Sequence, residues 1–374
     1  MRNIEMVDLK VQYRNIKEEM DRSIREVIDS AGFINGKAVQ AFSKDLAGYL
    51  GVKHVIPCAN GTDALQVAMM ALDLHSGDEV ICPSFTYFAT VEVIALLKLT
   101  PVFIDVNRET FTIEANEVEK AISSKTKAII PVHLYGQSAD MQPLLSLGKK
   151  YSIPIIEDNA QGIGGDYIFP DGTRKKTGTI AEIGSTSFFP SKNLGCYGDG
   201  GALITNDDLL AEKLRMIANH GQKDRYYHEV IGINSRLDTI QAAVLQVKLP
   251  HLDEYILARR KAASFYDQAF ANHNSIRVPY RAPYAYHVFH QYTLIVETDR
   301  DKLIKHLQEK QIPAMIYYPV ACHQQKAFEG KGRIVGDLKN TYWLSERVIS
   351  LPMHTELDEE QLEYITNGVL EFFQ

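Results

Sequence analysis

The feature that most constrains the fold is a pattern repeated between residues 53 and 207, in which short apolar runs alternate with helical stretches. Most of the runs are apolar almost throughout and end in polar or small residues, as expected of strands covered on both faces. The runs are Lys53–Ala59, Asp78–Ser84, Pro101–Val106, Lys127–Leu134, Ile153–Asp158, Ser185–Phe189 and Ala202–Asn206. Strands that alternate with helices predict a mostly parallel α/β sheet, which binds ligands at the carboxyl ends of its strands.

The pattern stops near Pro250, where a charged helical stretch, Asp253–Phe270, begins. The elements expected beyond it are the strands Gln291–Val296 and Pro313–Tyr318 and the helix between them, Asp301–Glu309. We therefore predict two domains, a large α/β domain over residues 1–250 and a smaller α+β domain over residues 251–374.

Composition argues against several classes of partner. The chain has a net charge of -7 and no run of lysine or arginine that offsets it, which argues against a nucleic-acid or anionic-membrane surface. The longest apolar runs are strand-sized and too short to span a membrane, and the first residues lack the apolar region of a signal peptide. The four cysteines lie far apart with no Cys-x-x-Cys pair, so we predict no metal site, no disulfide and a cytoplasmic location.

One candidate anion-binding segment is Asn60-Gly61-Thr62-Asp63-Ala64, between the first apolar run and a helical stretch whose apolar residues share one face. Gly61 permits a tight turn, after which the backbone N–H groups of Thr62 and Asp63 would point toward an anion, with the helix dipole behind them. Taken alone, such a segment is more often an ordinary helix N-cap. The segment Gly32–Ala38 resembles a phosphate-binding loop, but it is one residue too short and lacks a Ser or Thr after its lysine.

Two ionisable residues lie where solvent is scarce. Asp158 ends an apolar run, and a buried carboxylate needs a cation or strong hydrogen-bond donors, whereas Glu157 points to the opposite face of the same strand. Lys192 lies in a loop rich in proline and glycine between two apolar runs. A lysine and a carboxylate are what pyridoxal phosphate (PLP) requires, at its aldehyde carbon and its ring nitrogen. A helix-capping aspartate and a solvated lysine are the alternatives.

Six segments in register resemble the DegT/DnrJ/StrS-type PLP-dependent nucleotide-sugar aminotransferases. They are Asn60–Leu65, Ser84–Tyr87, Glu157–Gln161, Ser187–Gly195, Gly232–Ala243 and Tyr317–Gln324. Each segment is weak evidence by itself, but their order and spacing match that family over essentially the whole chain. The resemblance implies an aspartate-aminotransferase-like PLP fold and a homodimer with active sites at the subunit interface.

The resemblance also implies roles for individual residues. It makes Lys192 the Schiff-base lysine and Asp158 the partner of the pyridine nitrogen. The other cofactor contacts implied are Gly61, Thr62, Asp63 and Ser187 at the phosphate, Tyr87 on the ring, Gln161 near the ring oxygen, and Asn234 of the partner subunit, also at the phosphate. His323 and Tyr318 correspond to positions that contact the nucleotide sugar.

The implied reaction has two halves, in which L-glutamate gives its amino group to the cofactor and a keto nucleotide sugar then takes it up. Lys192 moves the proton in both halves, and Asp158 keeps the ring nitrogen charged. A PLP sugar dehydratase of the same fold is disfavoured, because those enzymes replace the lysine with histidine or add cluster-binding cysteines. A catalytically silent regulator is disfavoured by the intact Lys192, Asp158 and Gln161.

The sugar is indicated by two further similarities. Pro190, in the lysine loop, resembles members of the family that act at C3 of the sugar. The stretch His220–His228 resembles enzymes that aminate UDP-linked 2-acetamido-3-oxo-glucuronate for surface polysaccharides such as lipopolysaccharide, and it predicts that Arg225, His228 and Arg236 bind the carboxylate of this uronate. Surface cations explain Arg225 equally well. The alternative substrate is a dTDP- or UDP-linked keto-6-deoxy sugar, aminated at C3 or C4.

Overall fold

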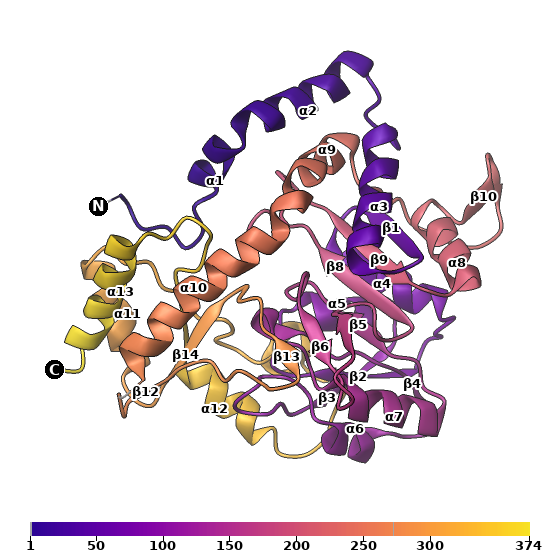
Figure 1. Ribbon diagram of the computed structural model, residues 1–374. Coiled ribbons are helices and arrows are strands. Elements are labelled where there is room, and N and C mark those ends of the chain that lie inside the picture. The colour runs from indigo at the N-terminus through magenta and orange to yellow at the C-terminus, as the bar shows by residue number, and fades with distance from the viewer. Residues whose placement is uncertain (1, 272) are drawn as a thin grey trace.

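The computed structural model describes residues 2–271 and 273–374. A central sheet has helices on both faces, and a smaller group of helices and strands from the C-terminal third lies beside it (Figure 1). The helices are α1 (Leu9–Asn15), α2 (Lys17–Ser30), α3 (Lys37–Leu50), α4 (Gly61–Ala71), α5 (Ala89–Leu96), α6 (Ala115–Ala121), α7 (Met141–Tyr151), α8 (Asp208–Ala218), α9 (Thr239–Lys248), α10 (Leu252–Phe270), α11 (Arg300–Glu309), α12 (Lys339–Arg347) and α13 (Glu359–Glu371).

The central sheet contains all seven predicted strands. They are β1 (His54–Cys58), β2 (Glu79–Pro83), β3 (Thr100–Ile104), β4 (Thr126–Ile129), β5 (Ile156–Asp158), β8 (Ile183–Ser187) and β9 (Gly201–Thr205). The strand order is β3-β2-β4-β5-β8-β9-β1, in which the bridges Ile129–Ile155 and Val132–Asp158 join β4 to β5. Every neighbouring pair is parallel except the two pairs that β9 makes with β8 and β1. The prediction of a mostly parallel sheet is therefore confirmed.

The reversed direction of β9 follows from its connection to β8. Parallel neighbours need a long crossover, usually a helix, whereas a loop lets consecutive strands pair antiparallel. Residues 188–200 contain no helix or strand, and Ser187 pairs directly with Gly201. The loop that contains Lys192 is therefore held at both ends by neighbouring strands of the sheet.

Both faces of the sheet are covered, as the continuous apolar runs predict. Along β2, Val80 and Cys82 pack into the core that includes α4 and α5, whereas Ile81 packs into the opposite core with α6 and α7. A third core joins α2, α3 and α9 to one face of β9. Because both faces are closed by helices, the edge formed by the strand ends remains available for a ligand.

The C-terminal third has its own antiparallel sheet, β12-β14-β16, with bounds Ile276–Arg277, Tyr292–Val296 and Val348–Leu351. Its core is shared with α10, α11 and α13. The predicted helices Asp253–Phe270 and Asp301–Glu309 and the predicted strand Gln291–Val296 are confirmed as α10, α11 and β14.

The predicted strand Pro313–Tyr318 is wrong. Only Met315 pairs with the sheet, in a single bridge with Ser350. Beyond it the chain leaves the sheet, and the Tyr135 hydroxyl donates a hydrogen bond to the Tyr317 carbonyl. The third strand of the sheet is instead β16, which directly follows α12 without the turn residues that mark a strand start in a sequence.

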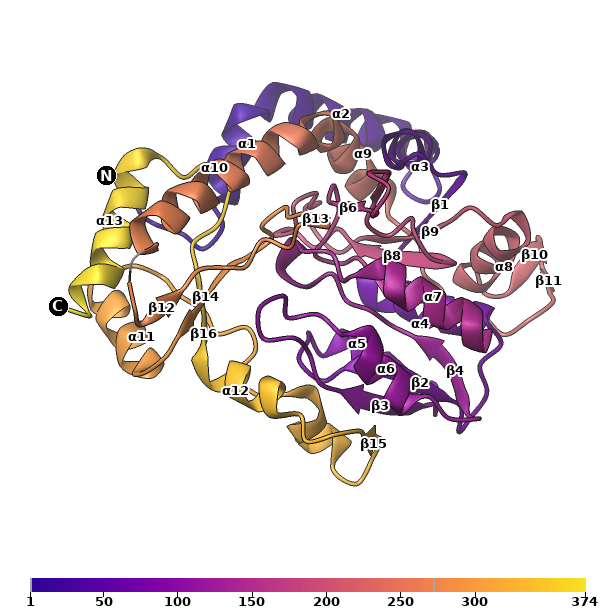
Figure 2. The same cartoon turned by 60° about the horizontal axis from the view of Figure 1, so that its bottom comes forward.

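Segments distant in sequence join the central sheet to the C-terminal third. A short strand, β15 (Arg333–Ile334), extends the central sheet by pairing parallel with β3 (Figure 2). In a three-stranded sheet, β13-β6-β7, the central strand β6 (Asp166–Ile168) pairs with β13 (Ala285–Tyr286) on one side and with β7 (Arg174–Lys176) on the other. Near the other end of the chain, Ile4 packs against the core of the C-terminal third.

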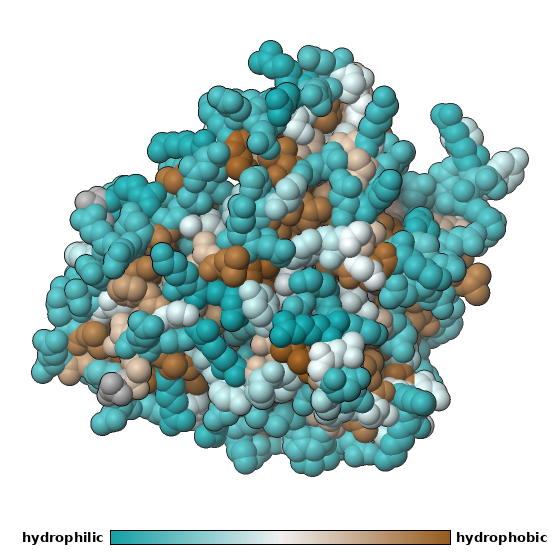
Figure 3. Space-filling view, in the orientation of Figure 1, coloured by the Kyte–Doolittle hydropathy of each residue, from teal (hydrophilic) through white to brown (hydrophobic). Residues whose placement is uncertain are grey.

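A two-stranded hairpin, β10 (Gln222–Asp224) and β11 (Tyr227–His228), projects from the side of the molecule (Figures 1 and 3). Its tip residues Tyr226 and Tyr227 are 75% and 73% exposed. Two adjacent tyrosine side chains therefore lie in solvent at the end of this hairpin.

Trp343 is the only tryptophan and lies partly buried in α12. The guanidinium carbons of Arg108, Arg277 and Arg347 lie 4.8, 5.7 and 5.1 Å from the centre of its ring system. Arg108 belongs to the loop after β3, so a cation–π contact joins the central sheet to the C-terminal third.

Within the described ranges, no helix is both long and apolar enough to cross a membrane. The same residues contain no group of three or more His, Cys, Asp or Glu side chains that could hold a metal ion. The four cysteines are buried and unpaired.

Candidate active site

A cavity of about 380 Å³ lies at the carboxyl ends of the parallel strands, where the sheet pattern predicts a site. Its walls come from the loops after β1, β2, β4, β5 and β8 and from two segments of the C-terminal third. The lining residues are Asn60, Gly61, Thr62, Leu65, Thr86, Tyr87, Ala89, Val132, Asp158, Ala160, Gln161, Ser187, Phe189, Ser191, Lys192, Asp199, His290, Gln291, Tyr317 and Tyr318.

Asp158 and Lys192 line this cavity together. The Asp158 carboxylate is buried and accepts hydrogen bonds from the Thr90 hydroxyl at 2.8 Å and the Ala160 amide at 3.2 Å. Burial raises the pKa of Asp158 and lowers the pKa of the Lys192 amine to about 8, while each charge favours the other. A lysine and a carboxylate with pKa values shifted in this way, in one cavity, are typical of an acid–base centre.

Glu157 faces away from the cavity, as strand alternation predicts. Its carboxylate is fully buried and accepts hydrogen bonds from the amides of Gly178, Ile180 and Ala181 at 2.6 to 2.8 Å. The His133 ring contacts it at 2.9 Å. These contacts satisfy the buried charge and fix the end of β5, and therefore the position of Asp158.

The start of α4 forms one end of the cavity. Asn60 is its N-cap, and the Asn60 side chain accepts the Asp63 amide at 2.7 Å. The prediction that the Asp63 amide faces an anion is therefore wrong, because the cap uses that amide. In the described chain, the amides of Gly61 and Thr62 have no acceptor and remain directed at the cavity end.

Gly61 is required by the close approach of α4 to β8. A Cβ atom at this position would lie 2.8 Å from the Ser187 Cβ atom. The Ser187 hydroxyl therefore stands next to the two free amides, and the three groups together suit a phosphate.

Gln161, Tyr87 and Tyr318 also line the cavity, as predicted. The Gln161 side chain accepts the Tyr135 amide at 2.7 Å and donates to the Tyr318 hydroxyl at 3.0 Å. The ring of Tyr87 is 58% exposed, with its centre 6.1 Å from that of Tyr318. An exposed ring at the mouth of the cavity is available to stack on a flat ligand.

Four predicted substrate residues, His323, Arg225, His228 and Arg236, are not among the residues that line this cavity. His323 contacts the Ser84 hydroxyl at 2.6 Å and the Tyr342 hydroxyl at 2.8 Å. Arg225 and His228 belong to the β10–β11 hairpin and, unlike Arg236, line neither this cavity nor the one next to it.

Arg236 and Asn234 line a neighbouring polar cavity of about 520 Å³. The two cavities share Asn60 and Asp199. A substrate that filled both cavities would therefore extend from Lys192 to Asn234 and Arg236, in contact with the protein along its length.

Sequence patterns missed the C-terminal wall of the active-site cavity, formed by His290, Gln291 and Tyr317. His290 is 5% exposed, and its ring Nδ1 atom is buried without a hydrogen-bond partner in the described chain. The only sequence signal was a polar pair, His290 and Gln291, at the start of an otherwise apolar strand.

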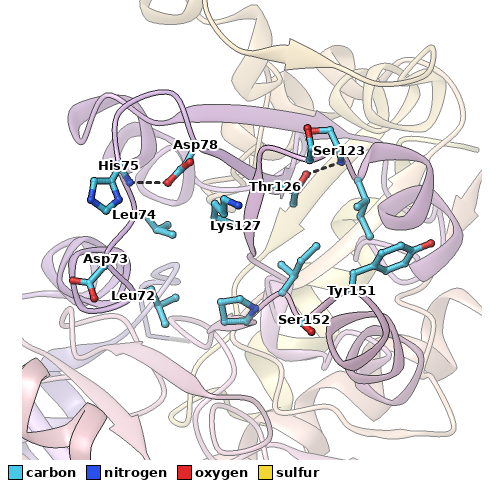
Figure 4. A pocket seen from close by; sticks show the side chains of 14 residues that line it. Leu72, Asp73, Leu74, His75, Asp78, Ser123, Thr126, Lys127, Tyr151 and Ser152 are labelled. Carbon is cyan, nitrogen blue, oxygen red and sulfur yellow. Dashed lines mark hydrogen bonds between the residues drawn. The ribbon is translucent and has the colours of Figure 1, made fainter.

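A larger cavity of about 600 Å³ lies elsewhere (Figure 4). Its residues precede β2, β4 and β5, so it lies at the amino ends of the strands. The Asp78 carboxylate accepts the His75 amide and the Thr126 hydroxyl accepts the Ser123 amide, which uses these groups in local turns. This cavity contains neither Lys192 nor Asp158, so it is not the site that the sequence predicts.

Comparison with known proteins agrees with this chemistry. Residues 14–370 match the DegT/DnrJ/EryC1/StrS aminotransferase family. The chain is 45% identical over 374 residues to the pleiotropic regulatory protein of Geobacillus stearothermophilus, covering 100% of this chain and 99% of that protein. It is 43% identical over 364 residues to the UDP-2-acetamido-2-deoxy-3-oxo-D-glucuronate aminotransferase of Pseudomonas aeruginosa, covering 97% and 98%.

Among solved structures, the crystal structure of S. venezuelae DesV in complex with a ketimine intermediate is similar throughout. It has a TM-score of 0.95 and 37% sequence identity, and the match covers 100% of this chain and 99% of that one.

Proposed function

Because the chain belongs to the DegT/DnrJ/EryC1/StrS aminotransferase family, we propose that it transfers an amino group from L-glutamate to the keto group of a nucleotide sugar. The protein is a PLP-dependent aminotransferase. The observation that carries the proposal is the pairing of Lys192 with Asp158 in one cavity, next to a helix start with free amides. The donor set, a lysine, a carboxylate and an anion cradle, fits PLP.

We assign the attachment of PLP and the proton movement to Lys192. When bound, PLP supplies an electron sink for negative charge at the substrate carbon that loses a proton. The lowered pKa of the Lys192 amine, about 8, leaves a substantial neutral fraction near that pH to accept the proton, and the same amine returns it in the second half of the reaction.

We assign to Asp158 the contact with the ring nitrogen of PLP. Burial raises the pKa of this carboxyl, so a cationic N–H is the partner that its ionised form lacks. Gly61, Thr62 and Ser187 hold the phosphate, and Asn234 of the partner subunit completes that site. Tyr87 covers the ring and Gln161 stands at its oxygen.

For the sugar, we propose C3 of UDP-2-acetamido-3-oxo-glucuronate, in the synthesis of a surface polysaccharide. The support is the 43% identity to the P. aeruginosa enzyme of that name and the proline at residue 190. Arg225, His228 and Arg236 are assigned to its carboxylate, and His323 and Tyr318 to the nucleotide sugar. A dTDP- or UDP-linked keto-6-deoxy sugar is the alternative.

We further propose a homodimer with the active sites at its interface. The exposed side chains of Tyr226, Tyr227 and Ile231, the last 86% exposed, would be covered by a second copy. In a dimer the hairpin could reach the other subunit's cavity, which would reconcile Arg225 and His228 with a role at the sugar. The four unpaired cysteines fit a reducing cytoplasm.

The test is a panel of keto nucleotide sugars offered to the purified holoenzyme with L-glutamate. We expect the visible absorbance to shift toward the pyridoxamine form with glutamate alone, and the 3-keto uronate to return it fastest. Faster turnover of a dTDP-4-keto-6-deoxy sugar would overturn the sugar assignment. No absorbance change with glutamate would overturn the choice of donor.

A further inference from the structure

His290 is the clearest unexplained group in the molecule. It lines the active-site cavity as part of the C-terminal third, it is buried, and its ring Nδ1 atom has no hydrogen-bond partner in the described chain. Burial and the nearby charges of Lys192 and Arg259 hold the pKa of His290 well below its usual value, so the ring is neutral. A buried imidazole without a partner is costly, which indicates that a ligand in the cavity uses it.

A second observation concerns the charge behind this histidine. Arg259, in α10, is 3% exposed, and none of the described carboxylates pairs with it. One terminal nitrogen donates to the carbonyls of Phe289 at 3.2 Å, His290 at 3.3 Å and Met353 at 2.9 Å. Burial lowers the pKa of Arg259 to about 10, so it stays charged at neutral pH. A buried cation without a counter-ion attracts an anion to the nearest accessible point.

Arg259 contacts the backbone carbonyl of His290, which itself lines the cavity, so its charge stands directly behind this part of the wall. Gln291 also lines the cavity, and its amide can donate a further hydrogen bond. The other anion-binding end, at Gly61 and Thr62, belongs to the sheet edge and suits the phosphate. The cavity therefore has two differently built ends that favour negative charge, and PLP accounts for one of them.

We propose that His290 and Gln291, backed by the charge of Arg259, bind the α-carboxylate of the amino-acid donor. This inference rests on the proposed aminotransferase function. The α-carboxylate is one bond from the carbon whose proton Lys192 removes, and the Lys192 ammonium is near enough to His290 to lower its pKa. The second carboxylate of glutamate lies two methylene groups farther away, so it does not need to be held next to the carbon that loses its proton.

The decisive variant is His290→Phe, which keeps the ring volume and removes the donor. The two half-reactions are measured separately by rapid mixing, first the PLP form with L-glutamate and then the pyridoxamine form with the keto nucleotide sugar. We expect the half-saturating concentration of glutamate to rise about tenfold or more, as for loss of a hydrogen bond to a charged group. The sugar half-reaction should change less than about twofold.

A matched control is His354→Phe. His354 is 2% exposed, also has an unpartnered ring nitrogen, and lies near Arg259, but it does not line the cavity. It should leave both half-reactions nearly unchanged. Equal losses in both half-reactions of the His290→Phe protein would mean a structural role and would overturn the proposal.

Two probes examine the carboxylate directly. α-Methyl-L-glutamate has no α-proton, so an absorbance titration gives its dissociation constant without turnover, and we expect about tenfold weaker binding to the His290→Phe protein. 4-Aminobutyrate is glutamate without the α-carboxylate, so the variant should lose much of the wild-type preference for glutamate over it. Unchanged binding and unchanged preference would refute the inference. If the wild-type protein reacts with another amino acid instead of glutamate, the donor assignment fails, and the same test applies to that amino acid.

Discussion

The two walls of the active-site cavity are built in different ways. The sheet-edge wall comes from short contiguous segments after β1, β5 and β8, and each places its functional groups through a strand end or a helix start. The C-terminal wall comes from residues 290–291 and 317–318. The first pair directly precedes β14, and the second follows Met315, where the chain leaves the C-terminal sheet beside the cavity. The first wall is specified by local geometry, and the second by the packing of the whole C-terminal third.

This difference predicts a division of labour. The sheet-edge wall should serve both half-reactions alike, because it holds the cofactor. The C-terminal wall should distinguish between the two substrates, because it faces what enters the cavity.

The largest expected effect is the loss of Lys192. Lys192→Ala should lower the rates of both half-reactions by roughly 10³-fold or more, since the cofactor attachment and the proton carrier disappear together. The measurement is single-turnover absorbance with each substrate. A loss confined to one half-reaction would contradict the prediction that the sheet-edge wall serves both half-reactions alike.

Lys248 provides the control for this assignment. It is buried, its pKa is also lowered to about 8, and its amine donates to the Gly195 carbonyl at 2.8 Å in the same loop, but it does not line the cavity. Borohydride reduction followed by peptide mass spectrometry should find the cofactor on Lys192. Cofactor on Lys248 would refute the assignment.

The next largest effect concerns Asp158. Asp158→Asn keeps the size of the side chain and removes its charge, so we expect both half-reactions to slow by about 10²-fold and the cofactor to bind more weakly. Equilibrium dialysis against PLP gives the affinity. An unchanged rate with normal cofactor content would show that another group serves the ring nitrogen.

The effect of pH on cofactor loading should be intermediate in size, between the effects of the Asp158 and Thr90 substitutions. The pKa of Lys192 is lowered to about 8, so its amine is mostly charged below that pH and mostly neutral above it. Because the neutral amine attacks the PLP aldehyde, the recombination rate of apoenzyme with PLP should rise about tenfold from pH 7 to pH 9 and then level off. A continued rise beyond pH 10 would indicate an unperturbed lysine.

The smallest effect is expected for Thr90→Val, which removes the donor 2.8 Å from the Asp158 carboxylate without changing the side-chain shape. We expect both half-reactions to slow about fivefold, corresponding to ~1 kcal/mol. Thr86→Val is the control, because the Thr86 hydroxyl contacts Thr90 but not Asp158. An effect on the sugar half-reaction alone would contradict the division between the walls.

The same division explains which parts of the site the sequence could predict. Lys192, Asp158 and Gly61 lie in contiguous motifs whose geometry follows from the strand or helix beside them. His290 and Gln291 have no such motif, because their place depends on a contact between segments far apart in the chain. The direction of β9 and the failed strand Pro313–Tyr318 have the same cause, since strand pairing is a tertiary property.

Two predictions depend on contacts between molecules or between domains. The hairpin residues Arg225 and His228 acquire a role only if a second subunit is present, so their assignment stays a prediction. The predicted domain boundary at residue 250 also stays a prediction. Ile4 belongs to the predicted large domain but packs against the core of the C-terminal third.

The lone tryptophan has a practical consequence. Trp343 touches Arg108 from the central sheet and Arg277 and Arg347 from the C-terminal third, so its surroundings change whenever these regions shift relative to each other. With excitation chosen to avoid the tyrosines, its fluorescence has a single source. The unlabelled protein therefore contains its own optical reporter of any movement between these regions, located outside the active-site cavity and usable in stopped-flow experiments alongside the visible absorbance.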